Sequence, residues 1–105
     1  MAGRRVDVPD DVQRIIAKLH PETKRKVRAA LEAIAEEPTV GKALGERLAG
    51  FRRIRIGRWR IVYREEGRII EVHAVGRRAT IYSDLIARLQ RRRRDHRGDR
   101  AVTRR

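Results

Sequence analysis

The sequence predicts an α+β fold, in which an N-terminal helical hairpin packs on a small twisted antiparallel sheet and a short C-terminal helix follows. Three observations predict it. Apolar residues recur with the period of a helix between residues 10 and 34, and the pattern changes to alternation from residue 51. The chain has 105 residues, which is enough for one domain with one modest core.

Two amphipathic helices are expected before residue 38. The first spans residues 10–19, where Asp10 or Asp11 can cap it. The second opens at Pro21, which suits a first helical turn, and ends before Pro38, since a residue that precedes proline disfavours the α conformation. The short turn between them makes a helical hairpin. Its apolar positions are Val12, Ile15, Ile16, Leu19, Val27, Ala30, Leu31 and Ile34.

A three-stranded antiparallel meander is expected after the hairpin. Residues 38–50 are expected to form a connecting loop that leads into it. Strands are predicted over residues 51–56, 59–64 and 69–75, and Gly57 suits the first position of a two-residue hairpin turn. One face of such a meander is available to the helices.

The C-terminal part divides in two. Residues 81–89 predict a short helix with apolar positions at helical spacing. Residues 91–105 contain eight arginines and two aspartates and almost nothing to bury, which predicts a flexible basic tail. We therefore expect one domain over residues 1–90 and a tail over residues 91–105.

The charge of the chain is strongly uneven. The formal net charge is +14, of which residues 1–50 contribute +2 and residues 51–105 contribute +12. All 18 basic residues of the second part are arginines, and arginine grips phosphate through two parallel hydrogen bonds. Such a field attracts polyanions or an acidic protein. The alternative is an arginine-rich surface that reflects compositional bias alone.

Several classes of protein are excluded. The chain has no cysteine, so it holds neither disulfides nor thiolate metal sites. It lacks a long apolar run and a secretory signal, which predicts a cytoplasmic protein without membrane contact. The histidines His20, His73 and His96 are scattered, and no Gly-rich phosphate loop is present, so we expect neither a metal site nor a small-molecule cofactor.

A cluster of arginines remains as the candidate site. Arg53 and Arg55 alternate on one strand face, about 6.5–7 Å apart by the rise per residue. Arginines that hold phosphates beside an aromatic ring that stacks a base would bind single-stranded RNA. The alternative is that these arginines merely solvate one face of the sheet. The candidate residues are Arg53, Arg55, Arg60, Arg77, Arg78 and Tyr82.

The order of elements and three motifs resemble the RelE/ParE toxin superfamily of toxin–antitoxin modules. The motifs are Phe-Arg-Arg-Ile-Arg-Ile from residue 51, Trp-Arg-Ile-Val-Tyr from residue 59, and Val-Gly-Arg-Arg-Ala-Thr-Ile-Tyr from residue 75. The resemblance covers about residues 6–89. It implies a RelE-like fold and, for the RelE-type branch, an endoribonuclease that cuts messenger RNA on the ribosome without a metal. Members of the ParE-type branch poison DNA gyrase instead.

The resemblance also assigns roles. It places catalytic functions on Arg60, Arg78, Tyr82 and Arg55, and RNA binding on Arg53, Arg55 and Arg77. The implied reaction is attack of a 2′-OH on the adjacent phosphate, giving a 2′,3′-cyclic phosphate. The implied partners are mRNA on the ribosome and an acidic, RelB-like antitoxin. Besides the ribonuclease, a gyrase poison and a non-catalytic RNA-binding domain remain as alternatives.

The general base of this reaction is left open. Arginine does not lose its proton near neutral pH, so the candidate arginines cannot serve. His73 is the one histidine on a predicted strand, and it can transfer a proton if its side chain faces the RNA. Alternation places its side chain with those of Glu71 and Val75.

Overall fold

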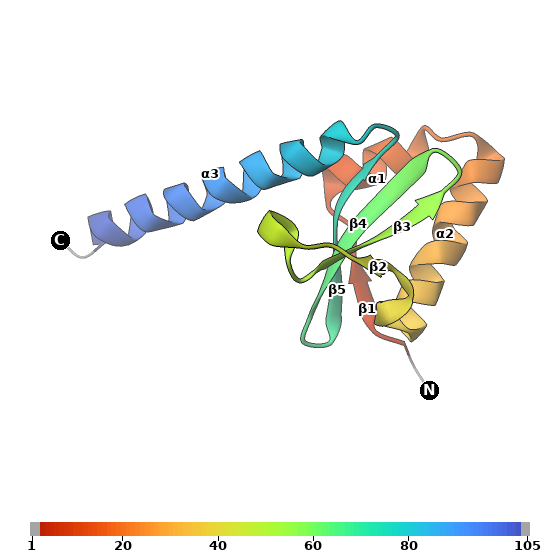
Figure 1. Ribbon diagram of the computed structural model, residues 1–105, viewed down its shortest axis with the longest axis horizontal. Coiled ribbons are helices and arrows are strands. Elements are labelled where there is room, and N and C mark those ends of the chain that lie inside the picture. The colour runs from red at the N-terminus through yellow and green to blue at the C-terminus, as the bar shows by residue number, and fades with distance from the viewer. Residues whose placement is uncertain (1–2, 104–105) are drawn as a thin grey trace.

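The fold is a five-stranded sheet with helices on both faces (Figure 1). The computed structural model describes residues 3–103, and the side chains of residues 3–93. The strand order is β1-β5-β4-β3-β2, in which β1 runs parallel to β5 and all other neighbours are antiparallel. The strands are β1 (Arg5–Asp7), β2 (Lys42–Ala43), β3 (Phe51–Ile56), β4 (Trp59–Glu66) and β5 (Ile69–Gly76). The helices are α1 (Asp10–Ala17), α2 (Pro21–Glu36) and α3 (Thr80–Thr103), with 3₁₀ turns at Pro38–Val40 and Glu46–Leu48.

Alternation along β4 divides the core between the two faces of the sheet. Ile61 and Tyr63, both fully buried, point toward the hairpin of α1 and α2. Val62 between them points to the other face and packs with Leu85 of α3. The hairpin face carries most of the core, and the α3 face is covered only in part. The second face is therefore where side chains remain available to a ligand.

The predicted α+β class is confirmed, and so are the hairpin and the meander. Both predicted helices form, and the turn after β3 has Gly57 at φ +59°, a conformation that glycine adopts without strain. The predicted cap of α1 is wrong in detail. Pro9 is the N-cap residue, and the two aspartates lie in the first helical turn, where they face the positive end of the helix dipole.

Two strands were not expected from the sequence. Residues 38–50 are not only a loop, because Lys42–Ala43 pairs with β3, and Arg5–Asp7 adds a parallel edge strand beside β5. The sheet is thus larger than the three predicted strands and not wholly antiparallel. Strands of two and three residues are too short to show an alternating pattern, and long-range pairing alone creates them.

The C-terminal helix is longer than the predicted 81–89. It runs from Thr80 to Thr103 and extends away from the body of the molecule (Figure 1). Arginine and glutamine favour helices, so a helix that is anchored at its start can continue through an arginine-rich segment. The division into a domain up to residue 90 and a tail stays a prediction. Among residues 3–103, no helix has the length and apolar character that crossing a bilayer requires.

Candidate functional site

The register between β3 and β4 gathers arginines on the face that α3 covers in part. Arg55 lies directly opposite Arg60, and Arg53 lies opposite Val62. Directly opposed residues of an antiparallel pair project to the same face. This register therefore places Arg60 on the face that Arg53 and Arg55 share. We call these three residues the arginine face.

The arginine face carries uncompensated charge. Like charges placed directly opposite each other across a sheet destabilise it. Among the ion pairs formed within the described residues, none involves Arg53, Arg55 or Arg60. At the other end of β4, by contrast, Arg64 pairs with both Glu66 and Glu71. The end of the sheet near the β3–β4 turn thus keeps its positive charge available for an anion.

Arg60 is the best fixed of the three. Its Nη1 donates a 2.6 Å hydrogen bond to the backbone oxygen of Arg77, just after β5 ends. This bond uses one of the five N–H donors of the guanidinium and fixes the orientation of the group. Fixed donors stabilise a developing negative charge better than mobile ones, because they need no reorganisation.

Arg78 and Tyr82 lie near the same end of the sheet. Gly76 is opposite Arg60 in the register, so the exposed Arg78 follows two residues beyond that row. Tyr82 lies in the first turn of α3 and is half-buried on the α3 face of the sheet. It packs against the core cluster that is formed by Leu48, Phe51, Val62, Ala74 and Leu85. The fold thus places Tyr82 on the side of the sheet that holds the arginine face, and Arg78 just beyond the end of the sheet where Arg60 lies.

Arg77 lies elsewhere. It lines a cavity of about 450 Å³ beside Trp59 and the helical hairpin, at the end of the sheet where β4 begins. Only its backbone oxygen contacts the arginine face, through Arg60. Its predicted role in RNA binding therefore requires that the RNA pass around this end of the sheet, from one face to the other.

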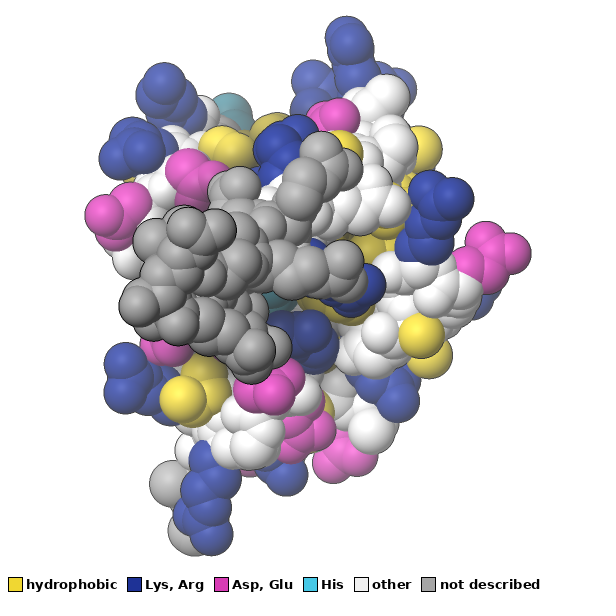
Figure 2. Space-filling view, turned by 90° about the vertical axis from the view of Figure 1, so that its left-hand side faces the viewer, with side chains coloured by type: hydrophobic (Ala, Val, Ile, Leu, Met, Phe, Trp, Pro, Cys, Tyr) yellow, Lys and Arg dark blue, Asp and Glu magenta, His cyan; other side chains and the backbone are white. Residues whose placement is uncertain are grey.

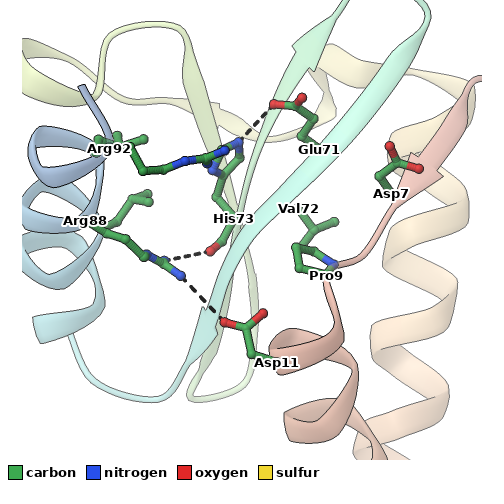
Figure 3. A pocket seen from close by; sticks show the side chains of 10 residues that line it. Asp7, Pro9, Asp11, Glu71, Val72, His73, Arg88 and Arg92 are labelled. Carbon is green, nitrogen blue, oxygen red and sulfur yellow. Dashed lines mark hydrogen bonds and ion pairs between the residues drawn. The ribbon is translucent and has the colours of Figure 1, made fainter. Parts of the chain in front are cut away.

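A second cluster on the α3 face centres on His73 (Figure 3). The Nε2 atom of His73 lies 3.1 Å from Glu71 Oε1, and its ring meets Phe51 edge to face at 5.0 Å. Arg64 donates to the same carboxylate at 3.2 Å and stacks over Phe51, 4.9 Å from its centroid. Arg88 of α3 donates to the backbone oxygen of His73 at 2.9 Å.

Burial and hydrogen bonding set the charges in this cluster. Burial lowers the pKa of His73 below its usual range, although the Glu71 carboxylate opposes the effect. The hydrogen bond from His73 lowers the pKa of Glu71, and that from Arg64 contributes less. Near neutral pH, His73 is therefore uncharged and Glu71 is ionised.

The predicted grouping of His73 with Val75 is wrong. A bulge shifts the β4–β5 register between Val62 and Tyr63, so that Val75 pairs with Ile61 on the hairpin face. His73 and Glu71 remain on the α3 face. Simple alternation fails at a bulge because one strand there carries an extra residue.

The residues of the second cluster other than His73 and Glu71 were not singled out by sequence reasoning. Phe51 lies two residues before Arg53, and Arg64 lies four residues after Arg60. Alternation along each strand therefore already placed Phe51 and Arg64 on the face of these arginines. Arg88 belongs to α3, and its contact with β5 depends on how the helix docks. Within the described residues, no group of three histidine or acidic side chains is arranged to hold a metal ion.

Comparison with known protein families shows the family to which this chain belongs. The model of the ParE toxin of the type II toxin–antitoxin system parDE matches residues 6–82. The chain belongs to this toxin family. It is thus a type II toxin of the RelE/ParE superfamily, as the motifs of its strands predicted. No curated protein matches it.

Solved structures of RelE toxins share the fold. The RelBE2 toxin–antitoxin complex of Mycobacterium tuberculosis is similar with a TM-score of 0.64 and 29% identity, over 75% of this chain and 95% of that one. An arginine-to-alanine double mutant of Escherichia coli RelE in the free state gives a TM-score of 0.69 at 19% identity, over 82% and 97%. The intact E. coli RelBE complex gives 0.63 at 18% identity, over 71% and 96%.

Proposed function

We propose that this toxin cleaves messenger RNA on the ribosome and uses the arginine face to hold and stabilise the phosphate that reacts. The observation that carries the proposal is the direct opposition of Arg55 and Arg60 with no carboxylate paired to either among the described residues. Two unpaired cations in adjacent strands cost stability, and an anionic substrate compensates for that cost.

The reaction needs positioning and charge stabilisation. The 2′-oxygen forms a bond to phosphorus, the bond to the 5′-oxygen breaks, and the products are a 2′,3′-cyclic phosphate and a 5′-OH. Arg60 and Arg78 are assigned to the charge that builds on the phosphate oxygens, and Arg53 and Arg55 to alignment of the RNA backbone. Tyr82 is assigned to stacking or to a hydroxyl contact at the rim.

The test compares two arginine-to-alanine variants in a translation extract. Removal of one fixed electrostatic donor typically lowers a rate about 100- to 1,000-fold, so Arg60→Ala and Arg78→Ala should each nearly abolish cleavage. Arg68→Ala is the matched control, because it removes the same charge from the exposed β4–β5 turn at the far end of β4. Mapping of mRNA 5′ ends measures cleavage, and thermal unfolding checks that each variant folds. Normal cleavage by Arg60→Ala would refute the assignment.

A second candidate function is poisoning of DNA gyrase. The specific observation in its favour is that the matching family model is that of a ParE toxin. The same extract separates the two functions, because codon-phased mRNA cuts support the ribonuclease, and double-strand DNA breaks that require gyrase support the poison. Absence of both would leave a non-catalytic RNA-binding domain.

The proposed protein partner is an acidic antitoxin. Two of the similar structures are complexes of a RelE toxin with its antitoxin. A net charge of +14 favours an acidic partner that neutralises part of this surface. Association should therefore be fast at low ionic strength and slow down as salt is added.

A further inference from the structure

A half-open cavity of about 450 Å³ lies where the helical hairpin meets the start of β4. Ile15, Leu19 and Trp59 provide its apolar lining. Ile15 is 38% exposed, an unusual exposure for a large hydrophobic side chain of this protein. The volume falls within the range of small-molecule sites, and it combines apolar walls with a few polar groups as such sites do.

Most polar groups of this cavity are donors, and the hydroxyl of Thr23 can either donate or accept. Lys18 and Arg77 contribute positive charge at its rim. His20 caps α2 by accepting a hydrogen bond from the backbone N–H of Glu22 at Nδ1, so its neutral ring carries the proton on Nε2 and can donate. The lining contains no carboxylate, whereas each of the four other cavities described in this structure has at least one. The cavity therefore fits a ligand rich in acceptors and negative charge.

The cavity and the arginine face lie on opposite faces of the sheet, at the end where β4 begins. Trp59 and Arg60 are adjacent in β4 and project to opposite faces of the sheet, with Trp59 packed on the hairpin side. Arg77 joins the two sites, because it lines the cavity while its backbone oxygen binds the guanidinium of Arg60. A nucleic-acid strand that is held on the arginine face therefore has only to pass around the start of β4 to reach Trp59 on the other face.

We propose that this cavity binds one base of the single-stranded RNA that the arginine face holds. The base stacks on Trp59, and Lys18 and Arg77 bind the flanking phosphate. This inference rests on the proposed function, because it takes RNA as the ligand of the arginine face. It accounts for two features that the arginine face alone leaves unexplained, the place of Arg77 in the cavity lining and the exposure of Ile15.

Tryptophan fluorescence reads this cavity directly, because the chain has one tryptophan. The probe is a short 2′-O-methyl oligoribonucleotide, which lacks the 2′-OH and cannot be cleaved by the proposed reaction. Anisotropy of an end label measures total binding, and Trp59 emission measures occupation of the cavity. An abasic oligonucleotide of the same length is the control for phosphate binding. We expect saturable quenching by the first and little quenching by the second.

Variants test the contacts. Loss of a base–aromatic stack weakens single-strand binding by about 5- to 100-fold, so Trp59→Ala should weaken binding by that amount and Trp59→Phe should retain most of it. Arg77→Ala should weaken binding and quenching together, and its exposed position keeps the test valid if Trp59→Ala fails to fold. Arg68→Ala, which removes an equal charge outside the cavity, should change binding several-fold less.

The outcomes separate this inference from the proposed function. Labelled RNA that binds without any change in Trp59 emission would overturn the base site and leave the arginine face standing. RNA that does not bind at low salt would overturn both. Quenching by an acidic oligopeptide but not by RNA would assign the cavity to a protein partner and likewise overturn the inference.

Discussion

At the scale of single residues, His73 is held by contacts with β3, with Glu71 and with α3. Its side chain is only 12% exposed, its ring packs on Phe51, and its Nε2 is bonded to Glu71. The α3 helix adds a hydrogen bond to its backbone oxygen. A histidine held in this way has little freedom to exchange protons with a substrate. The general base that the sequence left open is therefore better sought outside this cluster.

The lowered pKa of His73 predicts acid sensitivity of the folded state. In the unfolded chain His73 has its ordinary pKa of about 6.5, whereas burial lowers its pKa in the folded chain. The unfolded state then holds more protons, so stability declines as pH falls through about 6.5, and Glu71 adds a loss of the same sign below about 4.5. Thermal unfolding measured between about pH 7.5 and about pH 5.5 should show a smaller decline for His73→Asn than for the natural chain. Parallel curves would show that His73 titrates normally.

At the scale of elements, Tyr63 ties the segment before β2 to the sheet. Its hydroxyl donates to the backbone oxygen of Pro38 at 2.6 Å and accepts from the N–H of Gly41 at 3.0 Å. Burial raises the pKa of Tyr63, so the hydroxyl keeps its proton and its role as a donor. This link holds the 3₁₀ turn Pro38–Val40 in place and sets up the pairing of β2 with β3. The arginine face thus depends on a buried contact behind it.

Alanine substitutions at two glycines test the contact between Tyr63 and the segment before β2. A Cβ atom on Gly41 would lie 2.5 Å from the Tyr63 hydroxyl and 2.9 Å from the backbone oxygen of Arg53. Gly41→Ala should therefore destabilise the protein by about 1–3 kcal/mol, because the backbone has to move. Gly45→Ala is the control, since a Cβ there meets nothing within 4 Å and φ is −129°. Urea denaturation measures the free energy of unfolding of both variants. Equal values would mean that the segment around Gly41 moves to accommodate the Cβ atom without loss of stability.

At the scale of the whole molecule, positively charged side chains are spread widely over the chain, but only some of them form ion pairs with carboxylates. Figure 2 shows dark-blue Lys and Arg side chains around the rim of the view, with acidic side chains between some of them. Arg4 and Arg64 are paired with glutamates near one end of the sheet. The arginine face at the other end is not paired within the described residues. The arginine face thus belongs to the larger set of arginines that form no ion pair among the described residues.

This distribution predicts how RNA binding responds to salt. Each phosphate neutralised on a single strand contributes about −0.7 to the slope of log affinity against log salt concentration. If the three arginines of the face each bind one phosphate, the slope is about −2 or steeper, and Arg55→Ala should make it shallower by about 0.7. Anisotropy titrations of a labelled single-stranded RNA over a range of salt measure both slopes. An unchanged slope for Arg55→Ala would remove this residue from the interface.

The sequence by itself determined the helical hairpin, the meander and the faces of β3 and β4. Helical and strand periods depend on neighbouring residues only, so the hairpin, the meander and the shared face of Arg53, Arg55 and Arg60 were predictable. Its motifs also indicated the toxin superfamily, which the family comparison confirmed.

Only the tertiary structure decided the rest. The edge strand β1, the bulge that sends Val75 to the hairpin face, and the cavity between Trp59 and Arg77 all arise where distant segments meet. The pairing of carboxylates with Arg64 but not with the arginine face also depends on such contacts. Contacts of this kind have no period along the chain, because they depend on packing and register between elements that the sequence separates by tens of residues.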